Sequence, residues 1–305
     1  MASRFFIFGA GYSGKAFAAA RPDPAIEIAG TTRSPEKFEG LHRAGIEPLV
    51  FDGNALSSDM AERLERTTHL IVSIAPEEAG DPVLNAARQT IEEQMPRLRW
   101  IGYLSTVGVY GDHSGGWVDE TSECRPVSRR SVMRVAADRE WLAFGEESGL
   151  PVAILRLSGI YGPGRNAFVN LSAGTAKRLV KQGQVFNRIH VDDIAGALWH
   201  LIGHDKGGVF NVTDDLPAPP QDVVAYAAGL MGVEPPPEIP FETAQLSPMA
   251  RSFYGENKRV ANAAIKQAGY RFRYPDHRSA FDAMWATQSW RGEGEHDARS
   301  PMKRS

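Results

Sequence analysis

The sequence of 305 residues predicts an α/β fold in which a doubly wound parallel sheet carries a smaller C-terminal α+β lobe. Three observations lead to this prediction. Short apolar runs alternate with segments of helical pattern over the first half of the chain, as in strands joined by helical crossovers. A glycine-rich turn follows the first apolar run. After residue 164 the alternation stops, and prolines break the last third into short elements.

The glycine-rich turn is a candidate phosphate-binding loop. The apolar run 5–8 enters the motif Gly9-Ala10-Gly11-Tyr12-Ser13-Gly14, which opens a helix-forming segment. Gly9 permits the tight turn, Gly11 lets the backbone approach a pyrophosphate, and Gly14 lets the helix pack closely on the sheet. The amides at the start of this helix, at Tyr12 and Ser13, face the anion. We therefore expect a dinucleotide site of the Rossmann type rather than a plain glycine-rich turn.

The end of the second apolar run, residues 26–29, indicates which dinucleotide binds. It leads into Thr31, Thr32 and Arg33, where a site that selects NAD carries Asp or Glu to hold the ribose 2′-hydroxyl. The threonine hydroxyls and the planar guanidinium of Arg33 suit a 2′-phosphate instead. The sequence therefore favours NADP over NAD as the cofactor. The alternative interpretation of Arg33 is a solvated loop charge.

The third and fourth apolar runs lead into further candidate cofactor residues. Residues 48–51 are followed by Asp52, and residues 69–74 are followed by Ala75. Ligands of open parallel sheets lie beyond the carboxyl ends of the strands, so we expect Asp52 near the adenine and Ala75 near the middle of the dinucleotide. For Asp52, a turn or a cap of the following helix is a close alternative.

The alternation continues to residue 157 and then changes. Beyond residue 164 the chain leaves the sheet and returns to it before the proline-broken last third, where a helix is expected to begin at Asn257-Lys258-Arg259. We expect strands at residues 5–8, 26–29, 48–51, 69–74, 101–104, 152–157 and 209–212, and helices at residues 57–67, 81–95, 130–147, 171–182 and 191–202.

These elements divide the chain into two parts and a tail. We expect residues 1–160 with 187–215 to form an NADP-binding domain. Residues 161–186 with 216–290 are expected to form a smaller substrate lobe that closes over the cofactor. Residues 291–305 are polar, charged and aperiodic, which predicts a disordered tail.

The composition indicates a globular protein that binds a small-molecule substrate. With 42% hydrophobic residues the chain can bury a large core, and its net charge of −3 without a dense basic tract before the last residues predicts no nucleic-acid and no membrane partner. The single cysteine, Cys124, excludes a disulfide framework and a multi-cysteine metal site. The N-terminal apolar run is too short for a signal peptide. We expect a cytoplasmic monomer or homodimer that binds no metal.

Four later motifs support a more specific interpretation. They are residues 104–111 (LSTVGVYG), 156–164 (RLSGIYGPG), 190–195 (HVDDIA) and 210–212 (FNV). Together with the glycine motif, their order and spacing resemble the extended and atypical branches of the short-chain dehydrogenase/reductase superfamily, in the NAD(P)-dependent epimerase/dehydratase group. The resemblance implies that Thr106 is the catalytic Ser/Thr, four residues before Tyr110 of the VYG triplet. It also implies NAD(P)-dependent chemistry, although a fold alone does not fix the reaction.

The chain departs from that family at one place. The family carries a YxxxK pair, in which the tyrosine transfers a proton and the lysine lowers the pKa of the tyrosine and binds the nicotinamide ribose. By register, Arg130 and Arg134 occupy these two positions. Arginine cannot act as a base near neutral pH, but Arg134 can still bind a ribose and Arg130 an anionic substrate group. The alternative is two surface arginines paired with Asp138 or Glu140.

If a proton is transferred, Tyr110 and Tyr161 are the phenols near the expected mouth of the site, although a buried tyrosine with a bonded hydroxyl is the commoner arrangement. His190 is better explained as a structural residue before a cap formed by Asp192 and Asp193. We expect an NADP-dependent oxidoreductase or epimerase-like enzyme that acts on a small polar substrate by hydride transfer. The alternative is a catalytically silent NADP(H)-binding sensor, which the loss of the YxxxK pair favours.

Overall fold

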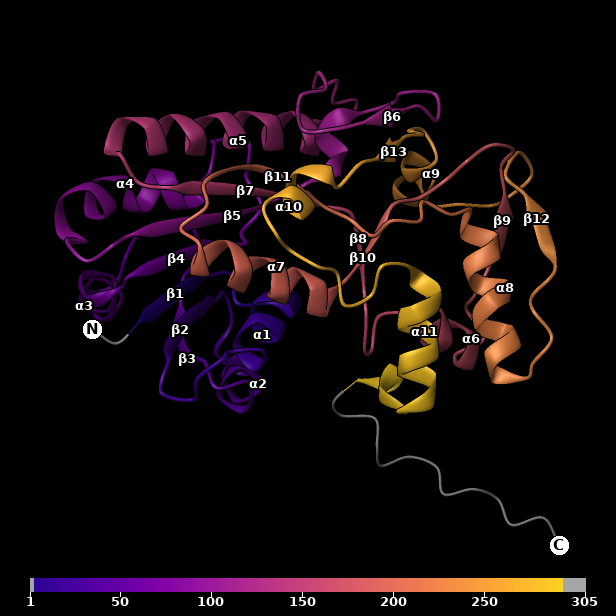
Figure 1. Ribbon diagram of the computed structural model, residues 1–305, viewed down its shortest axis with the longest axis horizontal. Coiled ribbons are helices and arrows are strands. Elements are labelled where there is room, and N and C mark those ends of the chain that lie inside the picture. The colour runs from indigo at the N-terminus through magenta and orange to yellow at the C-terminus, as the bar shows by residue number, and fades with distance from the viewer. Residues whose placement is uncertain (1–2, 293–305) are drawn as a thin grey trace, which may run out of the picture.

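A computed structural model describes residues 3–292, apart from the side chains of residues 248–250. Its centre is a seven-stranded parallel sheet with helices on both faces (Figure 1), which confirms the predicted fold class. The chain order reverses between β1 and β4, the switch point where ligands of doubly wound sheets bind. In sheet order the strands are β11 (Gly208–Val212), β7 (Val152–Leu157), β5 (Trp100–Thr106), β4 (His69–Val72), β1 (Arg4–Phe8), β2 (Glu27–Thr32) and β3 (Glu47–Val50).

The sheet is apolar on both faces because each strand directs alternate side chains into two cores. In β1, Phe5 and Ile7 face one core, and Phe6 and Phe8 face the other. This two-sided burial fixes the strand register. The first core is covered by α1 (Tyr12–Ala19), α2 (Phe38–Arg43) and α7 (Val191–Gly203), and the second by α3 (Ser58–Arg66), α4 (Pro82–Gln94) and α5 (Arg129–Ser148).

The register brings the carboxyl ends of the central strands to one edge of the sheet. Phe8 pairs with Val72, and Val72 pairs with Tyr103. The residues that follow these three, in β1, β4 and β5, therefore lie at the same level. This is the edge where the sequence predicts the cofactor.

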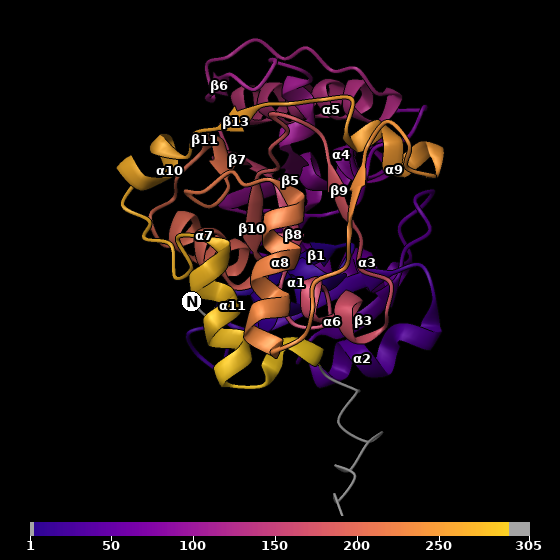
Figure 2. The same ribbon diagram turned by 90° about the vertical axis from the view of Figure 1, so that its right-hand side faces the viewer.

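A smaller lobe lies beyond this edge. In Figure 2 the molecule is turned so that this lobe faces the viewer. Its core contains Phe168, Val223, Phe281, Met284 and Trp290. Two pairs of short parallel strands, β8 with β10 and β9 with β12, join its segments. The elements are β8 (Gly159–Tyr161), α6 (Ala167–Ser172), β9 (Arg178–Val180), β10 (Arg188–His190), α8 (Pro220–Met231), β12 (Glu238–Pro240), α9 (Pro248–Phe253) and α11 (His277–Ala286).

The strands and helices predicted before residue 160 are present, with ends that differ by a few residues. Two later predictions are wrong. The helix expected over residues 171–182 stops where α6 ends, because Gly174 adopts φ +67°, and the chain then forms β9. The helix expected to begin at Asn257 is replaced by β13 (Arg259–Val260), which pairs with β6 (Trp117–Val118).

The boundary between the two parts also differs from the prediction. After β13, α10 (Ala263–Gln267) returns to the sheet, and Ile265 and Tyr270 are buried in the first core. The predicted tail starts too early, because Arg291 still belongs to the 3-10 turn η3 (Ser289–Arg291); residues 293–305 lie outside the described residues. Within residues 3–292 there is no helix long and apolar enough to cross a membrane.

Candidate active site

The glycine motif adopts the geometry that its three glycines predict. Gly9 leaves β1 with φ +83°, and a Cβ there would lie 2.9 Å from Ile74 Cγ1. A Cβ on Gly11 would meet only the carbonyl oxygen of Gly9, at 4.0 Å. A Cβ on Gly14 would lie 3.4 Å from Ile7 Cγ2, so α1 packs closely on the sheet. The space at Gly11, directly before the N-terminus of α1, can therefore admit an anion.

Tyr12 and Ser13, which are also predicted to bind the cofactor, form the first turn of α1. Ser13 is buried. The phenol hydroxyl of Tyr12 donates a hydrogen bond to the carbonyl oxygen of Pro163, 2.9 Å away in the small lobe, and burial raises the pKa of Tyr12. Tyr12 can therefore offer a phosphate its amide, while its side chain is engaged elsewhere.

The turn after β2 presents the residues predicted to select the dinucleotide. Thr31 is buried, and its hydroxyl oxygen accepts a hydrogen bond from the Gly9 amide at 2.9 Å, so it supports the glycine loop. Thr32 is half-buried, and Arg33 is exposed just before the 3-10 turn η1 (Pro35–Lys37). Thr32 and Arg33 thus follow directly on the residue that holds the glycine loop.

Asp52 and Ala75 both lie at the carboxyl edge and are exposed. The carboxylate of Asp52 accepts a hydrogen bond from the Asn54 amide at 2.9 Å, which lowers the pKa of Asp52 and forms the turn given above as the alternative. Ala75 follows Ser73, whose amide donates to the carbonyl oxygen of Phe8 at 2.8 Å. This bond keeps the loop after β4 beside the glycine turn, and the cofactor roles of both residues stay predictions.

Thr106 ends β5 and caps the 3-10 turn η2 (Val107–Tyr110). Its hydroxyl oxygen accepts a hydrogen bond from the Gly108 amide at 3.1 Å, which leaves the O–H to donate. A Cβ on Gly108 would lie 3.4 Å from Thr106 Oγ1 and 3.1 Å from Ser131 Oγ. Hydroxyl groups from β5 and α5 therefore both lie close to Gly108.

The inward-facing arginine of α5 is Arg134. Its Nη1 donates to the hydroxyl of Tyr103 at 2.8 Å and to the carbonyl oxygen of Leu104 at 3.0 Å. Leu104 comes directly after Tyr103, the last β5 residue paired with β4. The guanidinium of Arg134 therefore lies near the carboxyl edge of the sheet, and its role at the lysine position of the YxxxK pair stays a prediction.

Arg130 has different surroundings. It is exposed, because the residues that α5 buries nearby are Ser131, Val135 and Asp138. Asp138 is the partner of neither predicted arginine, since its carboxylate accepts a hydrogen bond from Arg156 Nε at 3.1 Å. Only one of the two predicted arginines therefore turns toward the interior.

Tyr110 is fully buried at the end of η2. Its hydroxyl donates to Asn211 Oδ1 at 2.7 Å and accepts from Arg156 Nη1 at 2.9 Å, and burial raises its pKa. Through Arg156 this network reaches Asp138, so it ties η2, β7, β11 and α5 together. A proton-transfer role for Tyr110 stays a prediction, and this network would have to open for it.

Tyr161 and His190 end the paired strands β8 and β10, with ring centroids 5.3 Å apart. Both are buried, which raises the pKa of Tyr161 and lowers that of His190 to about 4. His190 Nδ1 accepts a hydrogen bond from the Asp192 amide at 3.2 Å, so the histidine itself caps α7. Asp193 instead accepts a hydrogen bond from the hydroxyl of Tyr270 at 2.7 Å. His190 thus has the structural role that was predicted, but the aspartates are not the cap.

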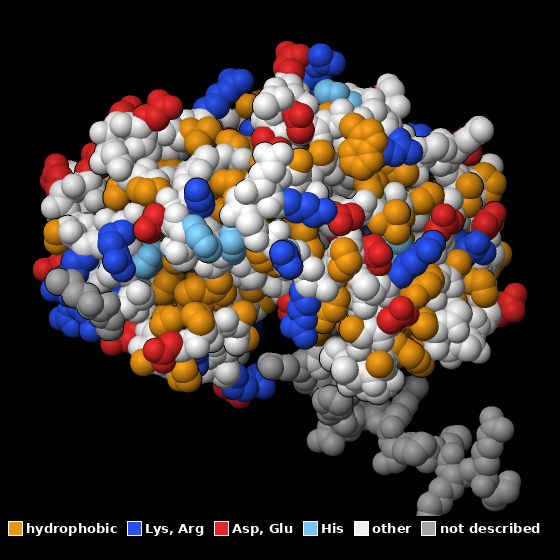
Figure 3. Space-filling model, in the orientation of Figure 1, with side chains coloured by type: hydrophobic (Ala, Val, Ile, Leu, Met, Phe, Trp, Pro, Cys, Tyr) orange, Lys and Arg blue, Asp and Glu red, His pale blue; other side chains and the backbone are white. Residues whose placement is uncertain are grey.

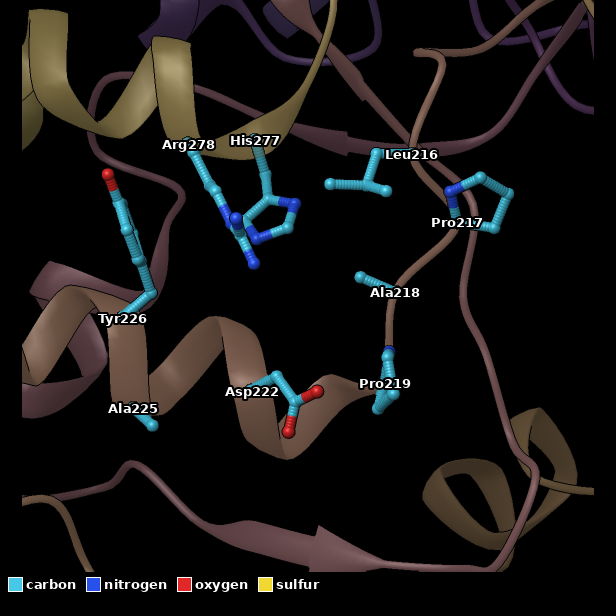
Figure 4. A pocket seen from close by; sticks show the side chains of 9 residues that line it. All are labelled: Leu216, Pro217, Ala218, Pro219, Asp222, Ala225, Tyr226, His277 and Arg278. Atoms are coloured by element: carbon cyan, nitrogen blue, oxygen red, sulfur yellow. The ribbon is translucent and has the colours of Figure 1, made fainter.

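A separate cavity of about 360 Å³ opens in the small lobe between the first turns of α8 and α11 (Figure 4). Asp222 of α8 faces His277 and Arg278 of α11 across it. The residues that line this cavity include none of those predicted to bind the cofactor or to catalyse.

Asp214 is buried just before the segment that walls this cavity. Its Oδ1 accepts a hydrogen bond from the Leu216 amide at 3.2 Å, and its Oδ2 has no hydrogen-bond partner within the described part of the chain. Burial raises the pKa of Asp214 to about 8. The charge of Arg188 opposes this shift, because it lowers the pKa of Asp214.

Figure 3 shows one face of the molecule. Acidic and basic side chains are intermixed there rather than gathered into a patch of one sign. The expected absence of nucleic-acid and membrane partners, and the expected monomer or homodimer, stay predictions.

Sequence reasoning overlooked two residues near the site. Ser131 Oγ lies beside Gly108, as Thr106 Oγ1 does, and Ser128 directly before α5 is a helix N-cap signal whose hydroxyl accepts a hydrogen bond from the Ser131 amide. Asn166 Nδ2 donates to the carbonyl oxygens of Gly162 and Trp290, at 2.8 and 2.7 Å. Its residue type directly before a helix is also a cap signal, but nothing local in the sequence indicates its distant partner.

A comparison with known families agrees with this arrangement. Residues 6–213 match the model of the NAD dependent epimerase/dehydratase family. The matched stretch extends from β1 to just beyond β11, so it contains the glycine motif, Thr106, Arg130 and Arg134.

Individual proteins are similar over nearly the whole chain. A functionally unknown conserved protein from Silicibacter pomeroyi DSS is 44% identical, with a TM-score of 0.85 over 94% of this chain and 99% of that chain. Protein YeeZ of Escherichia coli K12 is 28% identical over 284 residues, which are 88% of this chain and 96% of YeeZ. Human epimerase family protein SDR39U1, solved with NADPH, is 16% identical, with a TM-score of 0.68 over 93% of this chain and 99% of that chain. Two further structural neighbours, solved with NAD, are as distant in sequence as SDR39U1. At this distance, these three neighbours show the fold alone.

Proposed function

The chain belongs to the NAD dependent epimerase/dehydratase family, and from this premise we propose that it is an NADP-dependent oxidoreductase or epimerase-like enzyme acting on a small polar substrate by hydride transfer. The observation that carries the proposal is the space at Gly11, where a Cβ would meet nothing nearer than 4.0 Å. This space lies at the edge of the sheet that also carries Thr106 and Arg134.

The residues present fit a nicotinamide dinucleotide. The Gly11 opening and the amides at Tyr12 and Ser13 suit the pyrophosphate, because the N-terminus of α1 carries a partial positive charge. The loop after β4, including Ala75, suits the middle of the dinucleotide. When bound, the cofactor supplies or accepts the hydride.

The preference for NADP rests on the turn after β2. Arg33 is exposed there beside Thr32, and the turn has no Asp or Glu to hold a 2′-hydroxyl. The guanidinium can form charge-assisted hydrogen bonds with a 2′-phosphate. Neighbours of this fold were solved with NADPH and with NAD, so the fold leaves this choice to the loop residues.

The remaining roles go to the ends of β5 and α5. We assign the binding of the nicotinamide ribose to Arg134, and the hydrogen bonds of its guanidinium to Tyr103 and Leu104 support this role. Thr106 has an O–H available to orient a substrate oxygen. The exposed Arg130 can meet a carboxylate or phosphate of the substrate.

Proton transfer needs another source in this site. Arg130 stands at the family's tyrosine position and cannot take up a proton at neutral pH. The hydroxyls of Tyr110 and Tyr161 are buried, and burial raises the pKa of both. We therefore assign the proton to water at the mouth of the site.

Two measurements test this function. Calorimetry should show tighter binding of NADPH than of NADH, and equal affinities would contradict the NADP preference. Stopped-flow fluorescence should then show oxidation of bound NADPH by at least one member of a panel of aldehydes, ketones and nucleotide sugars. A protein that binds neither dinucleotide is not an enzyme of this kind.

The second candidate function is a catalytically silent NADP(H) sensor. It is favoured by Arg130 at the tyrosine position and by the buried hydroxyls of the two nearby tyrosines. This candidate predicts tight NADPH binding without turnover of any substrate in the panel. It also predicts that NADPH and NADP change the affinity for a protein partner.

A further inference from the structure

Tyr12 joins the glycine loop to the small lobe. It is the first residue of α1, yet its hydroxyl donates to the carbonyl oxygen of Pro163 at 2.9 Å. The hydroxyl lies against Gly162, where a Cβ would be 2.6 Å from Tyr12 Oη and 2.9 Å from Val191 Cγ1. Only a glycine at this position leaves room for the phenol. The contact between the two parts of the protein is therefore specific to Tyr12.

Asn166 holds the same loop from the other side. Its Nδ2 donates to the carbonyl oxygens of Gly162 and Trp290, and its Oδ1 accepts from the Val169 amide at 3.1 Å to cap α6. The Gly164 amide also donates to the carbonyl oxygen of Trp290, at 2.8 Å. The loop of residues 162–166 is thus fixed both to the start of α1 and to η3 near the end of the described chain.

Trp290 anchors this connection in the core of the small lobe. Its indole is 3% exposed in the core of the small lobe, with its ring centroid 5.8 Å from that of Phe168. The carbonyl group that receives the two hydrogen bonds is therefore held in place by packing. An uninterrupted path of contacts leads from this core through Asn166 and Pro163 to Tyr12.

We propose that Tyr12 and Asn166 are positioning residues that set the affinity for the nicotinamide dinucleotide by fixing the first turn of α1 against the loop of residues 162–166. The proposal rests on the proposed cofactor site, but it concerns side chains that contact the protein rather than the cofactor. The first turn of α1 presents its amides to the pyrophosphate, so any looseness of this turn lowers the affinity.

The test compares isosteric variants by fluorescence titration with NADPH. Tyr12→Phe removes one hydrogen bond between the two parts and should weaken binding roughly twofold to tenfold. Asn166→Asp keeps the oxygen that caps α6 but places a carboxylate against two carbonyl oxygens, so it should weaken binding by about tenfold or more. Unchanged affinity in both variants would overturn the proposal.

Two matched controls carry the same chemical changes elsewhere in the small lobe. Tyr226→Phe removes a hydroxyl that donates to Asp282 at 2.7 Å, and Asn170→Asp changes an exposed residue of α6. Both should bind NADPH as the unmodified protein does. If they weaken binding as much as the test variants, the effect comes from general damage to the lobe and the proposal is wrong.

The double variant tests whether the two residues act together. If Asn166 works through the loop that Tyr12 grips, Tyr12→Phe should add less than about twofold in the Asn166→Asp background. Fully additive losses would overturn the shared path.

Amide hydrogen exchange without cofactor provides a second readout. Asn166→Asp should speed exchange at Gly164 and also at Lys15, whose amide donates to the carbonyl oxygen of Gly11 at 2.9 Å. Faster exchange at Gly164 alone would show that the loop does not position α1. If the unmodified protein binds no nicotinamide dinucleotide, the proposed function fails, and this exchange pattern still decides whether the two residues position the turn.

Discussion

The glycine loop and the start of α5 lie at the same edge of the sheet, but the family's pattern is retained in one and altered in the other. In the loop, Gly9 has a positive φ, Gly11 opens onto space, and a Cβ on Gly14 would lie 3.4 Å from Ile7 of β1. At the start of α5 the helix and its serine cap are present, but by register Arg130 and Arg134 are predicted to occupy the positions of the tyrosine and the lysine in the pattern that the chain resembles. Dinucleotide binding depends on backbone shape and proton transfer on individual side chains, so a chain can keep one while it changes the other.

The largest expected effect comes from filling the opening in the glycine loop. Gly11→Val should weaken NADPH binding by on the order of a hundredfold or more, because the side chain takes the place of the pyrophosphate. Far-UV circular dichroism should stay near normal, since a Cβ at this position meets no atom nearer than 4.0 Å. Gly9→Val is the contrasting variant and should disturb folding, because of its positive φ and the 2.9 Å approach to Ile74. Unchanged NADPH affinity in Gly11→Val would show that the loop is not the phosphate site.

The second prediction concerns the pH dependence of the free energy of unfolding. It comes from Asp214, which lies outside both regions, and it gives the reference stability against which variants of the two regions can be compared. The folded-state pKa of Asp214, about 8, lies above its ordinary value of 3.8, so between these values the folded state holds a proton that the unfolded state has released. Stability should therefore fall as the pH rises through this window, by at most about 1.4 kcal/mol per pH unit. Asp214→Asn imitates the protonated form and should reduce the drop in thermal midpoint between pH 5 and pH 8. Equal drops in the two proteins would assign the pH dependence to other groups.

The third prediction concerns cofactor binding and tests which of the two dinucleotides the protein prefers. Arg33→Ala should cost about 1.5 to 3 kcal/mol of NADPH binding, because a charge-assisted contact to the 2′-phosphate is lost, and little of NADH binding. Calorimetry with both dinucleotides measures this difference. Arg43→Ala, at an exposed arginine of α2 paired with Glu39, is the control and should change neither affinity. A similar loss for NADH and NADPH in Arg33→Ala would place Arg33 away from the 2′-phosphate.

The smallest expected effects separate Arg130 from Arg134 in α5. Arg134→Ala removes the hydrogen bonds to Tyr103 and Leu104 and should lower stability by about 1 to 2 kcal/mol while also weakening NADPH binding. Arg130→Ala, at an exposed position, should change stability by less than about 0.5 kcal/mol. It should raise KM for an anionic substrate more than for a neutral analogue. Unchanged KM values would remove Arg130 from the substrate site.

The sheet and its helices were predicted well from the sequence, because the sequence signals for strand, turn and helix are local there. A short apolar run followed by glycines, repeated along the chain, specifies strand, turn and helix, and the strands β1 to β5 and β7 lie where these runs are. The glycine loop was predictable for the same reason, since Gly9 and Gly14 act through their own missing side chains.

The start of α5 and the small lobe were harder to predict because their structure depends on distant residues. Sequence spacing alone predicts that Arg130 and Arg134 act together on one face of the helix. Packing on the sheet instead turns Ser131 inward and Arg130 outward. The helical pattern over residues 171–182 is broken by a single glycine in the left-handed conformation, after which the chain pairs with β12. The partner of Tyr12 is a backbone carbonyl group, which no side-chain pattern reveals.

The bond between Tyr12 and Pro163 also bears on the order of events during synthesis. It joins residues 151 positions apart, and the bond between Asn166 and Trp290 spans 124 more. The glycine loop leaves the ribosome first, but its last support can form only after residue 290 has been added. Contacts between residues so far apart in the sequence form slowly, because the chain loses the entropy of closing a long loop before the contacts contribute stabilising free energy. The glycine loop is therefore expected to gain its full support only after the segment around Trp290 has been synthesised.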